Sequence, residues 1–480
     1  MLWLLPALTA LFHLGGLWCL RGVDPGRQAG WGLSAQLVAW LIAGLCWLAT
    51  LALLHRMQKS PRLVYIVLLG LLMRLPALFL PTVHSGDIYR YLWDGRVQAA
   101  GLNPYAGPPD AAPYVGVKAA HPELFARINH RELPTIYPPA AQNLFRLAET
   151  PQRWRLLCAG AELVLWLVLW LACSDRRWLT IWILAPLPAI ELWLNGHLDG
   201  FGVLLLLAGL VVLRRSSGGA ALPGALALST GLAGALLSLS VLVKPLSLAV
   251  VPGVVQTLRG AERRRSLVGL LLAGALLSAA LAWWPYRAAG LSVTPSLGEY
   301  GRRWRVNEGA YAILQGAAES AVAIAYKPPY YQPWRLPRVA RLINGRGRDT
   351  VWPDELAGFL ARAGAGAVLL GLLAIGLRRR LPFEHQGLLL LSGYALLTPA
   401  LHPWYLLWPL VLAPLWLPAA LPILLLAALA PLAYLPLPVE WAGGGHHEST
   451  WVRLCEHGPA WAAVAWLFFL HRRHCAGQST

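Results

Sequence analysis

Long apolar stretches separated by short polar segments run through the whole sequence. Leu163–Cys173, Phe201–Leu213, Leu267–Trp284 and Val368–Leu377 contain no charged residue. A helix needs roughly 20 predominantly apolar residues to cross ~30 Å of hydrocarbon. The pattern therefore predicts an all-α protein, a polytopic bundle of transmembrane helices that forms a single integral membrane domain over residues 1–480.

The apolar pattern predicts about 12–14 spans, because some of the stretches are short. The candidate spans cover residues 3–20, 31–53, 63–80, 156–173, 178–194, 200–213, 221–241, 244–257, 266–285, 358–377, 386–400, 404–416, 418–436 and 459–471. Only Leu417 separates two of them, so 404–416 and 418–436 are also compatible with one kinked or re-entrant element. Gly224–Ser240 is rich in small residues, which favours close helix packing.

Composition supports this class, since 57% of the residues are apolar and only 13% are charged. A soluble protein of this length would need far more polar surface. The net charge of +18 lies mostly in short basic clusters between apolar stretches, whereas a nucleic-acid-binding arm would be a continuous basic run. We therefore expect a membrane partner and no nucleic acid.

The basic clusters also predict orientation, because cytoplasmic loops carry an excess of Lys and Arg. With a cytoplasmic N-terminus, the inside loops contain Arg56, Lys59, Arg62, Arg176, Arg177, Arg214, Arg215, Arg259, Arg263, Arg264, Arg265, Arg378, Arg379, Arg380, Arg472 and Arg473. The short outside loops contain few cations. The expected location is the plasma membrane.

Two long segments, 81–155 and 286–357, then lie on the extracytoplasmic side. The first should contain helices, which we expect to lie at the membrane interface. Asp87–Ala100 predicts one helix, ended by Gly101, and a second begins near Pro139. Thr150 followed by Pro151 resembles a helix cap with a first-turn proline.

The unusual polar motifs all fall on this same side of the predicted bundle. They are His84–Asp87, Asn195–Asp199, Lys244-Pro245, Glu299–Trp304 and His402–Tyr405. Ionisable groups near membrane depth are costly and usually face a functional cavity. We therefore expect an extracytoplasmic site.

Acidic residues of the first long segment have two interpretations each. Asp87 could cap a helix, or it could accept a proton or hold a divalent cation. Asp94 lies four residues after Arg90 and could form an ordinary ion pair, or it could be a second carboxylate at the site. Tyr91 lies on the same helical stripe and is a candidate contact for a sugar or an acceptor.

The next two motifs, Asn195–Asp199 and Lys244-Pro245, also have two interpretations each. Asn195, His197 and Asp199 could form a polar turn between spans, or they could bind phosphate or sugar hydroxyls, with Asp199 as a supporting acid. Lys244 could snorkel to the interface, or it could neutralise a phosphate.

The last two motifs contain cations and aromatic residues. Arg302 and Arg303 could be loop charges, or they could bind phosphate oxygens bidentately. His402 is a further candidate phosphate ligand, whereas Trp404 could be an interface anchor or a sugar contact. Glu299 is a candidate contact for the sugar or the acceptor.

Several common motifs are absent from the sequence. It has no GxxxxGK[ST], HExxH or GxSxG pattern, and its six cysteines show no CxxC spacing. Nucleotide-driven transport and the common soluble hydrolase chemistries therefore lose support.

The run Gly86–Tyr105, GDIYRYLWDGRVQAAGLNPY, resembles the first outer loop of bacterial membrane glycosyltransferases of the GT-C fold, particularly the family 87 and mannopyranosyltransferase-like branch. Ile128–Gln142, Asn195–Gly200 and His402–Leu407 fit the same pattern. The resemblance implies a GT-C-like bundle and transfer of a hexose, for which the branch suggests mannose. The implied donor is a polyprenyl-phosphate sugar, and the acceptor is a lipid or a glycan.

The same resemblance implies that Asp87 is the catalytic aspartate, and that Lys244 and the Arg302/Arg303 pair contact the lipid phosphate. No acid stands directly before Asp87, so the paired-acid signature of the family is incomplete. No cofactor is therefore certain, although a divalent cation, Mg²⁺ or Mn²⁺, fits the family. The alternatives are a transporter or flippase of lipid-linked sugars and a polysaccharide polymerase.

Overall fold

In the computed structural model of the chain, the described residues are 3–21, 23, 31–57, 61–217, 223–258, 264–289, 293–325, 333–344, 349–441 and 448–477. Nearly all the secondary structure they form is helical, with one antiparallel pair of two-residue strands, β1 (Trp334–Arg335) and β2 (Thr350–Val351). The prediction of an all-α protein is therefore confirmed for the described residues. Of the loop cations, Lys59, Arg259 and Arg263 lie outside the described residues.

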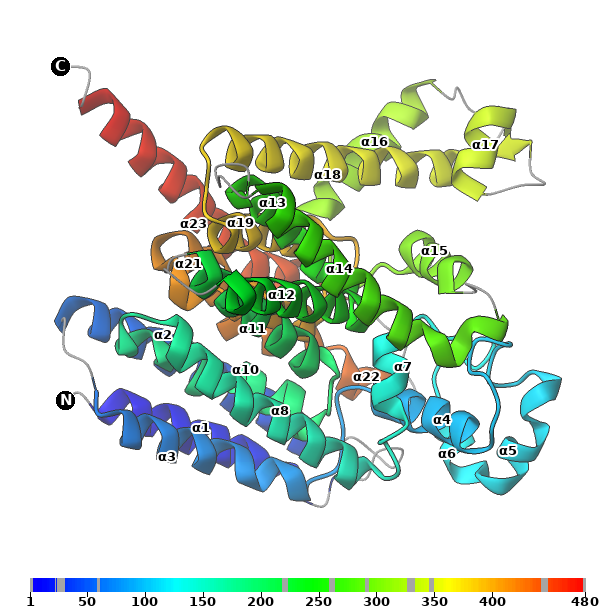
Figure 1. Ribbon diagram of the computed structural model, residues 1–480, viewed down its shortest axis with the longest axis horizontal. Helices are drawn as coiled ribbons and strands as arrows, with labels where there is room; N and C mark the ends of the chain where they lie inside the picture. Colours follow the sequence, from blue (N-terminus) through cyan, green and yellow to red (C-terminus); the bar gives the residue numbers. More distant parts are fainter. Residues whose placement is uncertain are drawn as a thin grey trace.

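The longer helices form the body of the protein (Figure 1). They are α1 (Leu4–Cys19), α2 (Trp31–Met57), α3 (Leu63–Arg74), α4 (Asp87–Ala99), α8 (Pro151–Ala172), α11 (Asp199–Ser217), α12 (Pro223–Val243), α13 (Val251–Leu258), α14 (Arg264–Trp283), α15 (Val293–Arg303), α16 (Ala310–Ala325), α17 (Pro337–Asn344), α18 (Pro353–Arg378), α19 (Phe383–Leu397), α21 (Leu417–Leu429) and α23 (Thr450–Gly477).

Shorter helical segments connect them. They are η1 (Leu75–Phe79), η2 (Ala112–Tyr114), α5 (Val115–Ala120), α6 (Pro122–Arg127), α7 (Pro139–Phe145), η3 (Arg176–Leu179), α9 (Thr180–Ile183), α10 (Pro186–Pro188), η4 (Ala189–Leu194), η5 (Pro245–Val250), η6 (Trp284–Ala289), η7 (Pro403–Leu406), α20 (Leu407–Leu410), η8 (Ala413–Leu415), η9 (Ala430–Tyr434) and α22 (Leu437–Trp441).

Five helices among the described residues are long and apolar enough to cross a membrane. They are Trp31–Met57, Pro151–Ala172, Ser266–Arg287, Pro353–Arg378 and Leu417–Glu440. The bent pair Pro186–Leu194 and Asp199–Ser216 makes a sixth if it is one span. Further apolar helices of 10–17 residues coincide with several of the shorter candidate spans, so the higher count of 12–14 remains a prediction.

Two candidate spans are not straight helices. Residues 176–194 and 403–415 instead form series of short helical turns that are almost completely buried. Proline is the physical reason, since it lacks a backbone N–H and breaks a helix. Pro186 and Pro188 interrupt the first segment, and Pro403, Pro409 and Pro414 interrupt the second.

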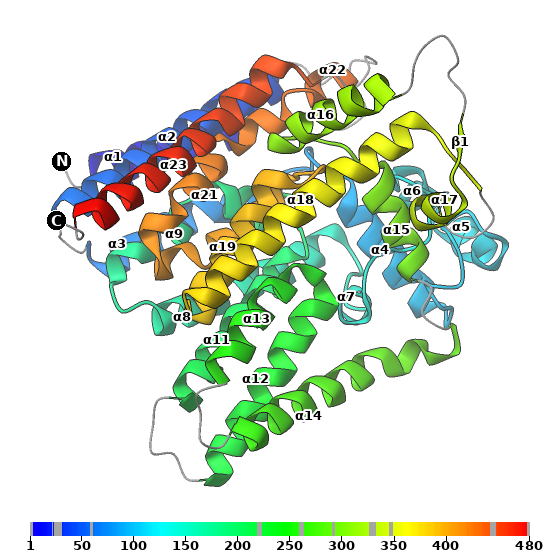
Figure 2. The same cartoon turned by 90° about the horizontal axis from the view of Figure 1, so that it is seen from above.

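The beginning of α1 and the end of α23 lie at one end of the bundle, whereas α4, α5 and α6 lie at the other (Figures 1 and 2). Helices α4 and α7 form where the sequence predicted helices in the first long segment, and their position at the membrane interface stays a prediction. At the end of α4, Gly101 has φ +75°, and the Leu102 N–H donates to the Val97 carbonyl over 3.1 Å, as in a Schellman cap. The Thr150 hydroxyl accepts from the Arg153 N–H at the start of α8.

The small-residue stretch packs as predicted, with α12 lying against α14. A Cβ added at Gly274 would lie 1.9 Å from the Gly231 carbonyl oxygen, and one at Gly234 would lie 2.0 Å from that of Leu271. The two backbones are therefore in direct contact, which requires glycine at these positions.

The second long segment is more structured than a loop. It contains α15, the apolar helix α16 and the short β1–β2 pair with α17, and α16 packs along α18. The 16-residue α16 is apolar and lies within residues 286–357, where the sequence predicted no span.

One buried ion pair joins α3 to α8. The Arg74 guanidinium donates to both carboxylate oxygens of Glu162 at 2.8–3.1 Å, and both side chains are inaccessible to solvent. Glu162 also accepts from the indole N–H groups of Trp166, Trp182 and Trp193. A carboxylate buried this deeply depends on its partners, because an uncompensated charge is costly in a low-dielectric interior.

We expect Glu162→Ala to lower the free energy of unfolding by about 3–5 kcal/mol, because it leaves the Arg74 charge buried without its partner. The measurement is thermal unfolding of the purified protein in detergent. Glu149→Gln is the control, since its pair with Arg153 is about half exposed and should contribute little. Equal stability of the Glu162→Ala variant and the parent would show that the pair does not stabilise the fold.

Candidate functional site

Asp87 lies at the N-terminus of α4, where the chain turns after η1. Gly86 occupies the cap position, and the Ser85 hydroxyl accepts the Asp87 N–H over 3.2 Å. The Asp87 side chain is 23% exposed. Its carboxylate accepts a hydrogen bond of 3.4 Å from the Tyr137 hydroxyl. The carboxylate is therefore held at the rim of a cavity rather than in bulk water.

Asn195–Asp199 forms the sharp bend between η4 and α11, which are inclined at 120°. Gly196 has φ +70°, and a Cβ there would lie 3.1–3.2 Å from three neighbouring side chains. Glycine thus permits both the backbone conformation and the close packing. The bend points His197 toward α4, with Nδ1 4.0 Å from the Asp87 carboxylate.

The second acid of the bend is paired with the predicted lysine. Lys244 follows α12, and its Nζ donates to Asp199 Oδ1 over 2.8 Å. The Trp408 indole N–H donates to the same oxygen over 2.6 Å. Lys244 Nζ also lies 4.1 Å from the centre of the Tyr405 ring. Asp199 is completely buried and Lys244 is 17% exposed, so the ammonium group is the member of the pair that reaches the cavity.

Trp404 lies between two histidines. Its ring is 3.9 Å from that of His197 and 4.4 Å from that of His402, nearly parallel to both. The stack fixes the orientation of both imidazoles and connects the 403–415 segment to the bend after η4. His197 Nε2 lies 3.4 Å from Glu191, so this ring is placed between two carboxylates.

These groups surround one cavity of about 380 Å³, within the range typical of small-molecule sites. Its lining comes from seven separated regions of the chain. It consists of His84, Ser85, Gly86, Asp87, Arg90, Tyr91, Asn129, His130, Leu133, Pro134, Ile136, Tyr137, Leu198, Lys244, Ser296, Tyr300, Trp304, Val306, Leu401, His402, Pro403, Trp404, Tyr405, Ala433, Tyr434, Pro436, Leu437 and Glu440.

Burial raises the pKa of Asp87 above its ordinary value, and the nearby Lys244 charge and the hydrogen bonds from Asn129 and Tyr137 oppose this shift. Burial lowers the pKa of His402 to about 3, with a smaller contribution from Lys244. It also lowers the pKa of His84 to about 4. Near neutral pH the imidazoles of His84 and His402 are therefore neutral.

The structure brings most of the predicted residues together. Asp87, Tyr91, Lys244, His402 and Trp404 line the cavity. Directly behind this lining lie the three polar residues of the bend: Asn195, His197 and Asp199. The five motifs, which are distant in sequence, thus meet in space around one cavity. Within them, only the side chains of Arg302 and Arg303 lie outside the described residues.

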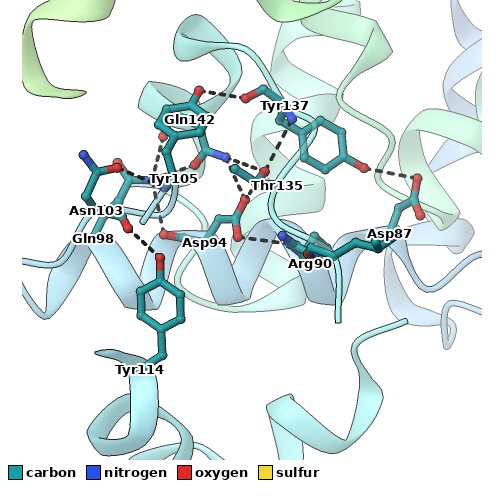
Figure 3. Close-up of polar contacts among 11 residues, drawn as sticks. Asp87, Arg90, Asp94, Gln98, Asn103, Tyr105, Tyr114, Thr135, Tyr137 and Gln142 are labelled. Carbon is teal, nitrogen blue, oxygen red and sulfur yellow. Dashed lines mark hydrogen bonds and ion pairs between the residues drawn. The ribbon is translucent and has the colours of Figure 1, made fainter. Parts of the chain in front are cut away.

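Asp94 is engaged elsewhere (Figure 3). Its carboxylate accepts from Arg90 at 3.1 Å, and from Thr135 and Gln142 at 2.7 Å each. It does not line the cavity. In this arrangement Asp94 fixes α4 to residues 135–142, which corresponds to the ion-pair interpretation of the sequence.

The second long segment reaches the cavity through α15. Ser296, Tyr300 and Trp304 line it, and the Tyr300 and Tyr405 hydroxyls are 2.7 Å apart. Glu299 lies on the same helix but outside the lining. The side chains of Arg302 and Arg303 lie outside the described residues, so their phosphate-binding roles stay predictions.

Metal binding gains no support from the donor set. Across the described residues, no group of three or more His, Cys, Asp or Glu side chains is placed to hold a metal ion. Asp94 is saturated by hydrogen bonds and Asp199 is paired with Lys244. These two carboxylates therefore do not fit a Mg²⁺ or Mn²⁺ site.

The sequence analysis did not identify three polar residues of this region, which are Glu191, Tyr137 and Tyr434. Glu191 is completely buried and accepts hydrogen bonds from Asn195 and Tyr434 at 3.1 and 3.0 Å. Tyr137 contacts Asp87. Glu191 had a detectable signal, since an acid inside an otherwise apolar stretch is unusual. The two tyrosines had none, because aromatic residues are abundant in this chain.

Comparison with protein-family models, with curated proteins and with solved structures gives no match for this chain.

We expect Lys244→Met to destabilise the protein by about 3–5 kcal/mol, because Asp199 then stays buried without a cation. The Asp199→Asn/Lys244→Met double variant should recover much of this loss, since no charge remains. Thermal unfolding in detergent measures both variants. If the double variant instead loses the sum of the two single effects, the two residues do not act as a pair.

Proposed function

We propose that the chain is a multi-pass membrane glycosyltransferase, with about a dozen spans, that transfers a hexose from a polyprenyl-phosphate donor to a lipid or glycan acceptor. The observation that carries the proposal is the placement of Asp87 and Lys244 on one cavity beside an aromatic–histidine stack. This arrangement supplies a base for the acceptor hydroxyl and a cation for the leaving phosphate, which are the two groups that glycosyl transfer from a phosphate uses.

Asp87 would act as the general base. The acceptor hydroxyl attacks the anomeric carbon while its proton passes to the Asp87 carboxylate. The bond between the anomeric carbon and the phosphate oxygen breaks, and its electron pair leaves with the polyprenyl phosphate. A single displacement of this kind inverts the configuration. Because phosphate is a stable leaving group, one carboxylate is sufficient.

Lys244 would stabilise the departing phosphate. An ammonium group has three donors, and only one of them is used by Asp199. The neutral His402 imidazole can donate one further hydrogen bond. Arg302 and Arg303, carried by α15 beside the cavity, would add positive charge on the donor side.

His197 would position the base. It lies 4.0 Å from Asp87 and 3.4 Å from Glu191, and its ring is fixed by Trp404. A proton on the nitrogen that faces Asp87 would favour the ionised carboxylate. Glu191 is thus a positioning residue, because it acts on Asp87 only through the imidazole.

The side of the membrane on which the Asp87 cavity lies follows from the arrangement of the helices. The Asp87 cavity lies toward α4, at the opposite end of the bundle from the beginning of α1 (Figure 1). With the N-terminus in the cytoplasm, this is the extracytoplasmic side. Plasma-membrane location and use of a lipid-linked donor from the outer leaflet are parts of the same proposal.

A transporter of lipid-linked sugars is the second candidate, and the broken pair η4–α11 favours it. Discontinuous helices that meet at a polar site are typical of secondary transporters. A transporter would move the intact donor across the membrane, whereas a transferase releases free polyprenyl phosphate. A polysaccharide polymerase would share the donor and differ in the acceptor.

We expect Asp87→Asn to reduce transfer by about 10²–10⁴-fold, because the base is lost. The assay incubates the purified protein with a panel of polyprenyl-phosphate sugars and measures released polyprenyl phosphate. Asp110→Asn is the matched control, since Asp110 is an exposed acid on the same long segment and outside the cavity.

Three results would contradict the proposal. They are full activity of the Asp87→Asn variant, an equal loss in the Asp110→Asn control, and movement of intact donor across a liposome membrane without release of lipid phosphate. Size-exclusion chromatography verifies that each variant is folded.

The pH dependence of transfer should report the ionisation of the Asp87 carboxylate. The carboxylate must be ionised to accept a proton, so activity falls as pH decreases through its raised pKa. We expect an acidic limb of kcat/KM above the ordinary aspartate value of 3.8. His402 and His84, with pKa values of about 3 and 4, stay neutral between pH 5 and 8 and change little there. An activity that is flat down to pH 4 would exclude Asp87 as the base.

A further inference from the structure

A second hollow lies at the opposite end of the bundle from the Asp87 cavity. α11 begins at Asp199 in the site and reaches Arg214 fifteen residues later, which is about 22 Å of helix. Two cavities of about 990 and 520 Å³ meet there and share Arg214, Glu384 and Leu415 in their walls. We call this continuous hollow the distal groove.

The charged lining of the distal groove is mainly positive. It consists of four arginines and one glutamate: Arg176, Arg214, Arg215, Arg380 and Glu384. The Arg214 guanidinium lies 3.9 Å from the Glu384 carboxylate and is 65% exposed. The glutamate therefore orients one arginine without neutralising the groove. Arg176 donates to the Cys173 carbonyl over 2.7 Å and lies 4.5 Å from the centre of the Trp170 ring, so this arginine is already engaged by the protein.

The start of α19 adds to this positive potential. Phe383, Glu384 and His385 form its first turn and line the groove. The first N–H groups of a helix have no partner within the helix, and the N-terminal end of its dipole favours an anion. α19 has 15 residues, so a full helix dipole is available. The groove thus combines arginines with a helix N-terminus, whose first turn also holds the Glu384 carboxylate.

The backbone at Arg380 is unusual. After α18 the Leu381 N–H donates to the Gly376 carbonyl over 3.0 Å, and Arg380 has φ +51°. Glycine is the favoured residue at this position of a Schellman cap, because other residues are strained there. Arginine in place of glycine puts a guanidinium group at the groove at some cost in stability, which points to a role in binding.

The other wall of the groove is apolar. Leu171 of α8 lines its smaller part and is 37% exposed, whereas Leu207, Leu210 and Val211 of α11 lie buried behind it. A phosphate ion would use only the basic part. A ligand with a phosphate headgroup and hydrocarbon chains would use both.

We propose that the distal groove binds the phosphate headgroup of an anionic phospholipid, whose acyl chains lie along the exposed apolar face of α8 formed by Leu163, Leu167 and Leu171. The guanidinium groups of Arg214 and Arg380 and the N-terminus of α19 contact the phosphate. Basic pockets between transmembrane helices recognise such headgroups elsewhere. This site is separate from the Asp87 cavity, and it does not depend on the function proposed for that cavity.

Titration of the purified full-length protein with phosphatidylglycerol, followed by native mass spectrometry, measures the apparent Kd. We expect Arg380→Gly and Arg214→Gln each to weaken binding by about fivefold, and the double variant by about 25-fold. Arg380→Gly introduces the residue that the backbone favours, so it tests binding without loss of folding. The control is Arg56→Gln/Arg62→Gln, which removes two cations from the ends of α2 and α3 outside the groove.

Three parallel measurements identify the ligand. Phosphatidylcholine with the same acyl chains should bind at least tenfold more weakly than phosphatidylglycerol. Inorganic phosphate should not compete at lipid-equivalent concentrations. Equal affinity for both lipids, competition by inorganic phosphate, or an equal loss in the Arg56→Gln/Arg62→Gln control would each overturn the proposal.

Discussion

The interior of this bundle can hold a charge only where an opposite charge or several hydrogen bonds compensate it, and the positions of the helices follow from that constraint. Arg74 and Glu162 join α3 to α8, and Lys244 and Asp199 join the end of α12 to the start of α11. Apolar contacts alone allow helices to slide or rotate, because one leucine surface resembles another. The ion pairs define the register, and the Asp87 cavity is built on the second of them.

The cavity also depends on broken helices. Gly196 and the prolines of the 403–415 segment interrupt regular structure, so that His197, Trp404 and His402 can stack. An unbroken helix would place its side chains at fixed spacing around an axis and could not converge them in this way. The departures from regular helix are thus part of how the site is formed.

Local signals in the sequence predicted the structure well where local chemistry decides it. The α4 boundaries, the Thr150 cap and the small-residue contact of α12 all follow from neighbouring residues. The shape of residues 176–194 and 403–415 was not predicted, because hydropathy is the same for a straight span and for a buried series of turns.

The site was predictable to a similar extent. Charged residues and histidines stand out in a mostly apolar sequence, so Asp87, Lys244 and His402 were predicted as site residues, and all three line the cavity. The engagement of Asp94 by Thr135 and Gln142 depends on a segment 40 residues away. The Tyr137 contact depends on the same fold. Tertiary structure decides these contacts, and no single window of sequence contains them.

The backbone contact between α12 and α14 has a consequence for how the chain can change over generations. At Gly234 and Gly274 even one added methyl group would clash with a backbone carbonyl of the other helix, so we expect these two positions to accept no larger residue. The outward leucines of α14, such as Leu276 and Leu281, are about two-thirds exposed and can exchange freely with other apolar residues. Mutational tolerance on this helix should therefore be lowest where the side chain is smallest.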